Sequence, residues 1–166
     1  MQRWAATRSV SKALGPDLRL AVLAGDPQTV ARVQGRQQCG PGWVSHILQS
    51  LVLCLWSDRR VRSLVRRANG VYAERRGELL RRLRAHGVDA SGASGLNVWV
   101  PVADETVVVG ALLQRGWVVA PGAAYRLAPS PPAVRVTIAT LTAPEAERLA
   151  ADLAEAIAPA RWARSG

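Results

Sequence analysis

The chain has 166 residues, 49% of them hydrophobic, which is enough for one core with a second, small lobe. Its formal net charge of +10 favours an anionic partner. The longest apolar run, residues 43–56, is interrupted by polar residues and is too short to span a bilayer, which argues against a membrane-spanning segment.

The first third of the chain alternates strand and helix patterns. Residues 3–8 and 19–24 are predicted strands. Asp26 is a suitable N-cap for a helix over residues 27–38. A helix over residues 43–56 follows that is apolar on almost every side, so we expect it to be buried in a core or an interface.

A long helix is predicted over residues 59–86, and it ends before Gly87. Ten arginines lie between Arg59 and Arg84, but the apolar residues among them fall at helical spacing and form one stripe. A solvated helix face therefore explains the arginines better than a nucleic-acid site does, since no zinc-finger spacing or aromatic RNA-binding motif accompanies them.

The remaining residues form a different pattern, in which short strands and helices alternate. The expected elements are strands 95–102, 117–120 and 133–139, helices 105–115 and 143–158, and a proline-rich loop 126–132. Asp104 is placed to cap the first of these helices, and Thr142 and Glu145 have capping-box spacing at the second. This order predicts a small α+β lobe whose helices cover one face of an antiparallel or mixed sheet.

Lys12 is the only lysine, against twenty-one arginines. An amine can become a nucleophile and condense with an aldehyde, whereas a guanidinium cannot. Ser9, Ser11 and Arg19 surround it with the hydroxyl and guanidinium groups that bind phosphate. The set suggests pyridoxal 5′-phosphate as a cofactor; the alternative is a solvated surface lysine.

Residues 9–20 read Ser-x-Ser-Lys-x-x-x-Pro-x-Leu-Arg-Leu. The pattern resembles the lysine signature of class I/II (fold type I) pyridoxal-phosphate aminotransferases, most closely the aminotransferase-like domains of MocR/GntR-type regulators. The resemblance implies a Schiff base on Lys12 and a phosphate held by Ser9, Ser11 and Arg19. Asp17 stands where the family usually has glycine, so we expect its carboxylate to point outward.

Arg135 lies in the middle of an otherwise apolar strand. Burying an unpaired arginine is costly, and a ligand carboxylate would remove that cost, but the solvent face of the strand or an internal acid would also explain it. The strand resembles the family's arginine-containing strand, which implies that Arg135 binds the substrate carboxylate. Tyr125 and Arg126 either line the substrate entrance or pack the loop.

The resemblance covers nearly the whole chain but only the C-terminal half of the family fold. It implies an α/β fold, with residues 1–58 as a remnant of the pyridoxal-phosphate-binding large domain, 59–86 as a connecting helix and 87–166 as the small C-terminal α+β domain. The family's ring-stacking aromatic and pyridine-nitrogen Asp have no counterpart, so we expect a fragment, a split gene product or a truncated reading frame.

The leading hypothesis is an aminotransferase-type module that moves an amino group between an amino acid and a 2-oxo acid, completed by a missing N-terminal half or a homodimer. The alternatives are an amino-acid-sensing or cofactor-sensing regulator domain and an inactive fragment; direct nucleic-acid binding is least favoured. Cys39 and Cys54, without a secretory signal, predict reduced thiols and a cytoplasmic location. No metal site is expected.

Overall fold

The computed structural model describes residues 2–158. The chain divides into two compact units, residues 1–67 and 68–166, here called the first and the second unit. Helix α4 (Arg59–Ala85) contains the boundary between them. The division at residues 58 and 86 that the sequence suggested stays a prediction.

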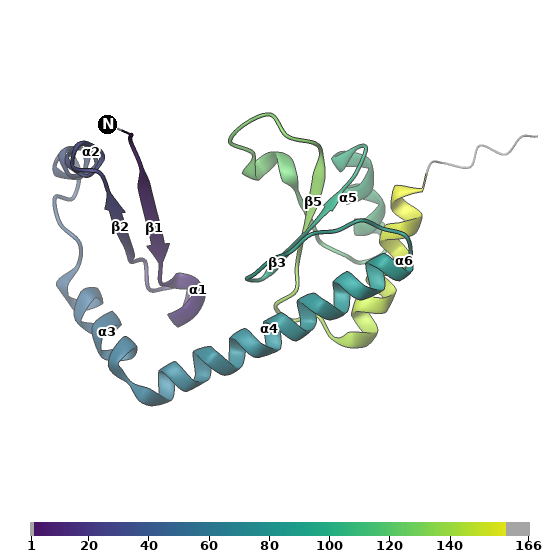
Figure 1. Cartoon of the computed structure of the whole chain (residues 1–166), viewed down its shortest axis with the longest axis horizontal. Coiled ribbons are helices and arrows are strands. Elements are labelled where there is room, and N and C mark those ends of the chain that lie inside the picture. The colour runs from purple at the N-terminus through teal and green to yellow at the C-terminus, as the bar shows by residue number, and fades with distance from the viewer. Residues whose placement is uncertain (1, 159–166) are drawn as a thin grey trace, which may run out of the picture. The chain divides into compact units, whose positions relative to one another are not determined.

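The first unit is built on an antiparallel hairpin (Figure 1). Its strands are β1 (Ala5–Ser9) and β2 (Ala21–Gly25), and its helices are α1 (Ser11–Leu14), α2 (Pro27–Gln38) and α3 (His46–Ser57). Asp26 caps α2 by accepting the N–H of Thr29 at 3.1 Å, as the sequence predicted. Both predicted strands and the helix over residues 27–38 are confirmed.

The core of the first unit is small: of residues 2–67, only Val10, Leu18 and Val52 are buried in it. Helix α3 buries Val52 and packs the partly buried Leu48 and Leu55 against this core. Ile47 and Leu53 on the same helix are 80% and 65% exposed. Burial of this helix in the core of its own unit is therefore wrong for the described residues, while burial in an interface, the other part of the expectation, stays a prediction. The physical reason is that the hairpin and its connection pack against one side of the helix only.

Helix α4 begins after Asp58, whose carboxylate accepts the N–H groups of Arg60 at 2.6 Å and Val61 at 3.2 Å. It ends at Ala85, and Gly87 follows with φ +73°, the left-handed conformation that commonly ends helices. Leu79 and Leu83 on this helix are fully buried in the core of the second unit. The predicted long helix is confirmed.

The second unit contains a three-stranded antiparallel sheet in the order β3-β5-β4. Figure 1 labels its strands β3 and β5. The elements of this unit are β3 (Asn97–Pro101), α5 (Glu105–Gln114), β4 (Ala120–Pro121), the 3-10 turn η1 (Gly122–Tyr125), β5 (Ala133–Thr137) and α6 (Ala143–Ile157). The strand expected over residues 117–120 is wrong for all but its last residue. Trp117 instead donates its backbone N–H to Leu112 at the end of α5 and its indole N–H to Asp152 on α6.

The two faces of this sheet have different roles. On one face, valines of β3 and β5 pack with α4, α5 and α6 into a single core: Val98, Val100, Val134 and Val136. The opposite face carries Trp99 and Arg135, which are cross-strand partners in the register of β3 and β5. The predicted sheet with helices on one face is confirmed, and Arg135 lies on the face turned away from that core.

Candidate functional site

Lys12 lies in α1, the single helical turn that follows β1, and its side chain is exposed. Val10, directly before this turn, is buried, with 3% of its surface exposed. Its backbone N–H donates to the carbonyl of Leu20 at 3.1 Å. This bond closes the connection between the two strands of the hairpin. The only lysine is thus presented to solvent from a turn with a buried anchor.

The two serines beside Lys12 contact each other. The Ser9 hydroxyl donates to Ser11 Oγ at 3.2 Å, and the Ser11 backbone N–H donates to Ser9 Oγ at 3.3 Å. The Ser11 hydroxyl itself donates to the carbonyl of Leu18 at 2.9 Å. Arg19 follows Leu18 directly and is exposed, as is Asp17. The end of β1 and the connection to β2 therefore carry all four predicted cofactor residues. Asp17 is exposed, as expected.

Arg135 has an unusual environment on β5. Its Nε is buried and has no hydrogen-bond partner among the residues that the structure describes. Its guanidinium carbon lies 3.9 Å from the centre of the Tyr125 ring, a cation–π contact. Tyr125 meets Trp99 edge-on, with ring centres 6.0 Å apart. The guanidinium is therefore oriented by an aromatic ring, and at least one of its donors is unused.

Glu105 is a functional candidate that the sequence did not indicate. Its carboxylate is only 9% exposed and accepts the backbone N–H groups of Ala123 at 2.8 Å and Ala133 at 3.0 Å. Arg126 also donates to it. The pKa of Glu105 is held below its usual value, mainly by the N–H bond from Ala123 and then by that from Ala133. The positive charge of Arg126 lowers it further. Arg126 thus packs the loop, while Tyr125 lies against Arg135.

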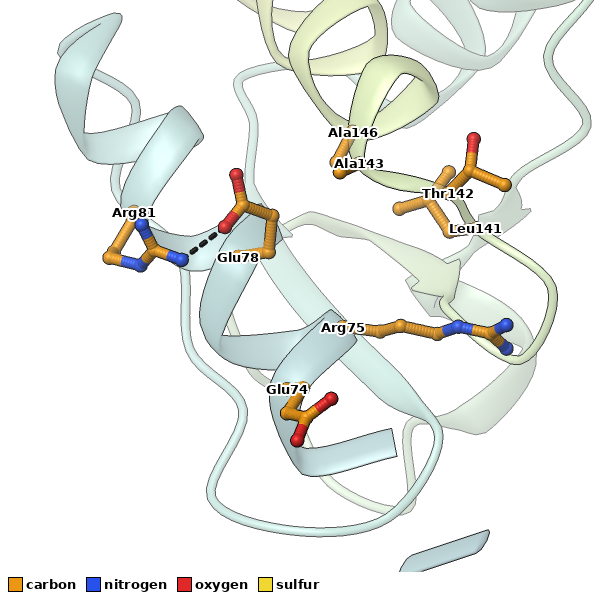
Figure 2. Close-up of a pocket in the computed structure, with 8 residues that line it drawn as sticks. All are labelled: Glu74, Arg75, Glu78, Arg81, Leu141, Thr142, Ala143 and Ala146. Carbon is orange, nitrogen blue, oxygen red and sulfur yellow. Dashed lines mark hydrogen bonds and ion pairs between the residues drawn. The ribbon is translucent and has the colours of Figure 1, made fainter. Parts of the chain in front are cut away.

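A separate pocket of about 320 Å³ lies between α4 and the start of α6 (Figure 2). Its charged lining residues are two acids and two arginines from α4: Glu74, Arg75, Glu78 and Arg81. Glu78 pairs with Arg81 and Arg82, and Arg75 donates to the carbonyl of Ala139. The Arg75 bond links α4 to the loop before α6, whereas the Glu78 ion pairs stay within α4.

Within residues 2–158 no three potential metal ligands cluster together. Over the same residues, no helix has the length and apolar character that crossing a bilayer requires. Both cysteines, Cys39 and Cys54, are free and exposed.

Residues 2–153 match the family model described as aminotransferase class I and II. The match covers most of the chain, so the chain belongs to this family. The identification agrees with the lysine motif around Lys12 and with the arginine on β5, the two features from which the resemblance was first inferred.

A curated relative is the vitamin B6 salvage pathway transcriptional repressor PtsJ of Salmonella typhimurium. It is 38% identical over 157 residues, which are 94% of this chain and 36% of the repressor. The sequence resemblance to a transcriptional regulator with an aminotransferase-like domain is thereby confirmed. The chain spans about a third of that relative.

Solved aminotransferases share the fold. The Pyrococcus horikoshii kynurenine aminotransferase matches with a TM-score of 0.76 and 19% identity, over 91% of this chain and 39% of the enzyme. The Thermus thermophilus aspartate aminotransferase with maleate matches with a TM-score of 0.75 and 21% identity, over 92% of this chain and 41% of the enzyme. The predicted α/β fold, as one part of a larger aminotransferase fold, is confirmed.

Proposed function

We propose that this chain supplies part of an aminotransferase-type site, in which Lys12 binds pyridoxal 5′-phosphate and an amino group moves between an amino acid and a 2-oxo acid. The observation that carries the proposal is the placement of the only lysine, exposed and directly beside the Ser9–Ser11 hydroxyl pair. Membership of the aminotransferase class I and II family supports the proposal. In such enzymes the cofactor carries out the chemistry, so the cofactor determines the class of reaction.

The residues between the two strands fit a phosphate ester carrying an aldehyde. The exposed Ser9 hydroxyl can turn from Ser11 to a phosphate oxygen at the cost of one weak hydrogen bond. The Ser11 hydroxyl would exchange its bond to the Leu18 carbonyl for one to phosphate. Arg19 adds a forked cation, and the nearby Asp17 is exposed, so its charge is screened by water.

The division of work follows from the side chains. When bound, the cofactor stabilises negative charge at the substrate α-carbon. The Lys12 amine is the group suited to take a proton from that carbon and to return one, acting as general base and then general acid. Ser9, Ser11 and Arg19 would hold the phosphate of the cofactor, and the Lys12 amine would condense with its aldehyde.

Arg135 is proposed to bind the carboxylate of the amino acid. A guanidinium forms two parallel charge-assisted hydrogen bonds with a carboxylate. In this chain the guanidinium is already stacked on Tyr125, and its buried Nε has no partner among the described residues. Because the buried Nε is shielded from solvent, a carboxylate ligand would accept instead from the terminal N–H groups of the guanidinium.

The test is the absorbance band that stays with the full chain after incubation with pyridoxal 5′-phosphate and removal of the free cofactor, which is itself coloured. Lys12→Arg keeps the positive charge but removes the condensing amine, so we expect it to show no band. As a matched control, Arg8→Lys in the Lys12→Arg background returns a lysine to the neighbouring strand β1 and should also stay colourless. A colourless wild-type chain at high cofactor concentration would contradict the proposal.

A regulatory role is the second candidate, favoured by the 38% identity to a transcriptional repressor. In that case the cofactor-loaded chain would bind an amino acid without converting it. Addition of amino acids separates the two: formation of a 2-oxo acid favours the enzyme, and a spectral change without product favours the sensor. If the wild-type chain shows no more absorbance than Lys12→Arg, the chain is an inactive module.

The proposal includes completion of the site by further polypeptide, either an N-terminal segment or a second copy in a homodimer. The exposed apolar residues of α3 support this part, because such surfaces normally pack against protein.

A cytoplasmic location is proposed on the free, exposed thiols of Cys39 and Cys54.

A further inference from the structure

One carboxylate holds both ends of the segment that carries Tyr125. Glu105, in the first turn of α5, accepts from Ala123 at the start of residues 122–133 and from Ala133 at their end. Arg126, in between, donates to the same carboxylate. A proline-rich loop that is otherwise exposed is thereby fixed at three points by a single buried group.

The bonds to Glu105 fix the part of the segment that contacts Arg135, which is Tyr125. Tyr125 immediately precedes Arg126, and its ring carries the guanidinium of Arg135. Tyr125 is itself 45% exposed, so burial alone does not hold it in place. The bonds to Glu105 on either side of Tyr125 restrict its position, and the edge-on contact with Trp99 restricts the ring.

The negative charge of Glu105 is paired with Arg126, which leaves the positive charge of Arg135 available for a ligand. Glu105 pairs with Arg126, the arginine nearest to Tyr125 in the sequence. No ion pair of Arg135 is present among residues 2–158. The acid therefore neutralises the loop arginine and not the strand arginine, whose charge stays free for a ligand.

We propose that Glu105 is a positioning residue, which keeps Tyr125 stacked on Arg135 and so presents the guanidinium to a carboxylate ligand. This inference rests on the proposed role of Arg135. Glu105 does not touch the ligand; it acts through the segment 122–133. A purely structural role would stabilise the loop and leave the orientation and ligand affinity of Arg135 unchanged.

The test uses the full chain labelled with nitrogen-15 and follows the Nε–H signal of Arg135, assigned by its loss in Arg135→Lys. In the wild type we expect a signal shifted by the Tyr125 ring and protected from exchange, because Nε is buried. In Glu105→Gln an amide NH₂ faces the N–H of Ala123, and the ionic bond to Arg126 is lost. The Arg135 signal should then move to the position of exposed arginines.

Pyruvate serves as the carboxylate probe. If Glu105 orients Arg135, Glu105→Gln should bind pyruvate about tenfold more weakly, the equivalent of roughly one charge-assisted hydrogen bond. Glu155→Gln is the matched control, because Glu155 also pairs with an arginine, Arg115 at 2.9 Å, but lies on α6. It should leave the Arg135 signal and the pyruvate affinity unchanged.

Each outcome has a distinct meaning. A folded Glu105→Gln with an unchanged Arg135 signal would overturn the positioning role. If that variant does not fold, Arg126→Gln decides, since it removes one tether and keeps both backbone bonds: a shifted Arg135 signal supports the role, and an unchanged signal overturns it. If pyruvate leaves the wild-type signal unmoved, the carboxylate role of Arg135 fails, while the shift caused by Glu105→Gln still tests the positioning.

Discussion

At the scale of single residues, Gly122 lies where the chain passes closest to β5. A Cβ at this position would lie 2.5 Å from the carbonyl oxygen of Ala133 and 3.2 Å from Glu105 Oε1. The first of these is a backbone atom held in the sheet, so it cannot move aside. The close packing that lets Glu105 reach both ends of the segment therefore requires a residue without a side chain here.

We predict that Gly122→Ala lowers the free energy of unfolding of the second unit by about 2 kcal/mol, through overpacking. Gly110→Ala is the control, because Gly110 lies in α5 with no atom within 4 Å of the added Cβ. That change should stabilise by about 1 kcal/mol through helix propensity. Denaturant melts measure both, and equal effects of the two variants would refute the packing argument.

The sequence predicted some of the candidate residues better than others. Ser9 ends β1, and Ser11, Lys12 and Arg19 lie in the connection that follows it, so their closeness follows from local chain geometry. Glu105 could not be found in this way. Its partners lie 18 and 28 residues further along the chain, and only the folded sheet brings them to it.

At the scale of elements, the helix starts were the most predictable features. Asp26, Asp104 and Thr142 each cap a helix, because a cap depends on atoms within three residues. For α6, Glu145 accepts both the N–H of Thr142 at 2.8 Å and its hydroxyl at 2.7 Å. Local chemistry therefore sets where this helix begins.

Removal of this cap should be measurable. Thr142→Ala is expected to lower the free energy of unfolding of the second unit by about 1 kcal/mol, the usual cost of losing an N-cap. Thr140→Ala changes an exposed threonine two residues earlier and should have little effect. Urea midpoints compare the two variants; a Thr142→Ala midpoint equal to that of the wild type would show that the cap contributes nothing.

Two elements were predicted less well, for reasons outside their own sequence. Burial of α3 depends on the surfaces available to it, and the first unit offers only the side near Val52. The strand before Pro121 is short because Trp117 is drawn to α5 and α6 by its backbone and indole N–H groups. The hydrophobic pattern of a segment shows neither which surfaces will pack against it nor which distant groups its side chains will bond.

At the scale of the whole molecule, the two units have very unequal cores. Among residues 2–158, three hydrophobic residues are buried in the core of the first unit, against fifteen in that of the second. Because burial of apolar area supplies most of the stability, the first unit should be much the weaker.

We therefore predict that unfolding in urea has two steps and that residues of the first unit unfold first. Hydrogen exchange measures this directly: amides of β1 and β2 should exchange faster than those of β3 and β5. A single cooperative transition with equal protection of β1 and β2 and of β3 and β5 would show instead that the chain unfolds as one unit.

The central claim is that Lys12 is the amine that binds pyridoxal 5′-phosphate. Borohydride reduction of the chain after incubation with the cofactor, followed by peptide mapping, tests it most directly, because the only other primary amine in the sequence is the N-terminus. The account predicts a stable pyridoxyl label on the peptide containing Lys12, absent in Lys12→Arg. A label on the N-terminal amine alone, or no label, would contradict it.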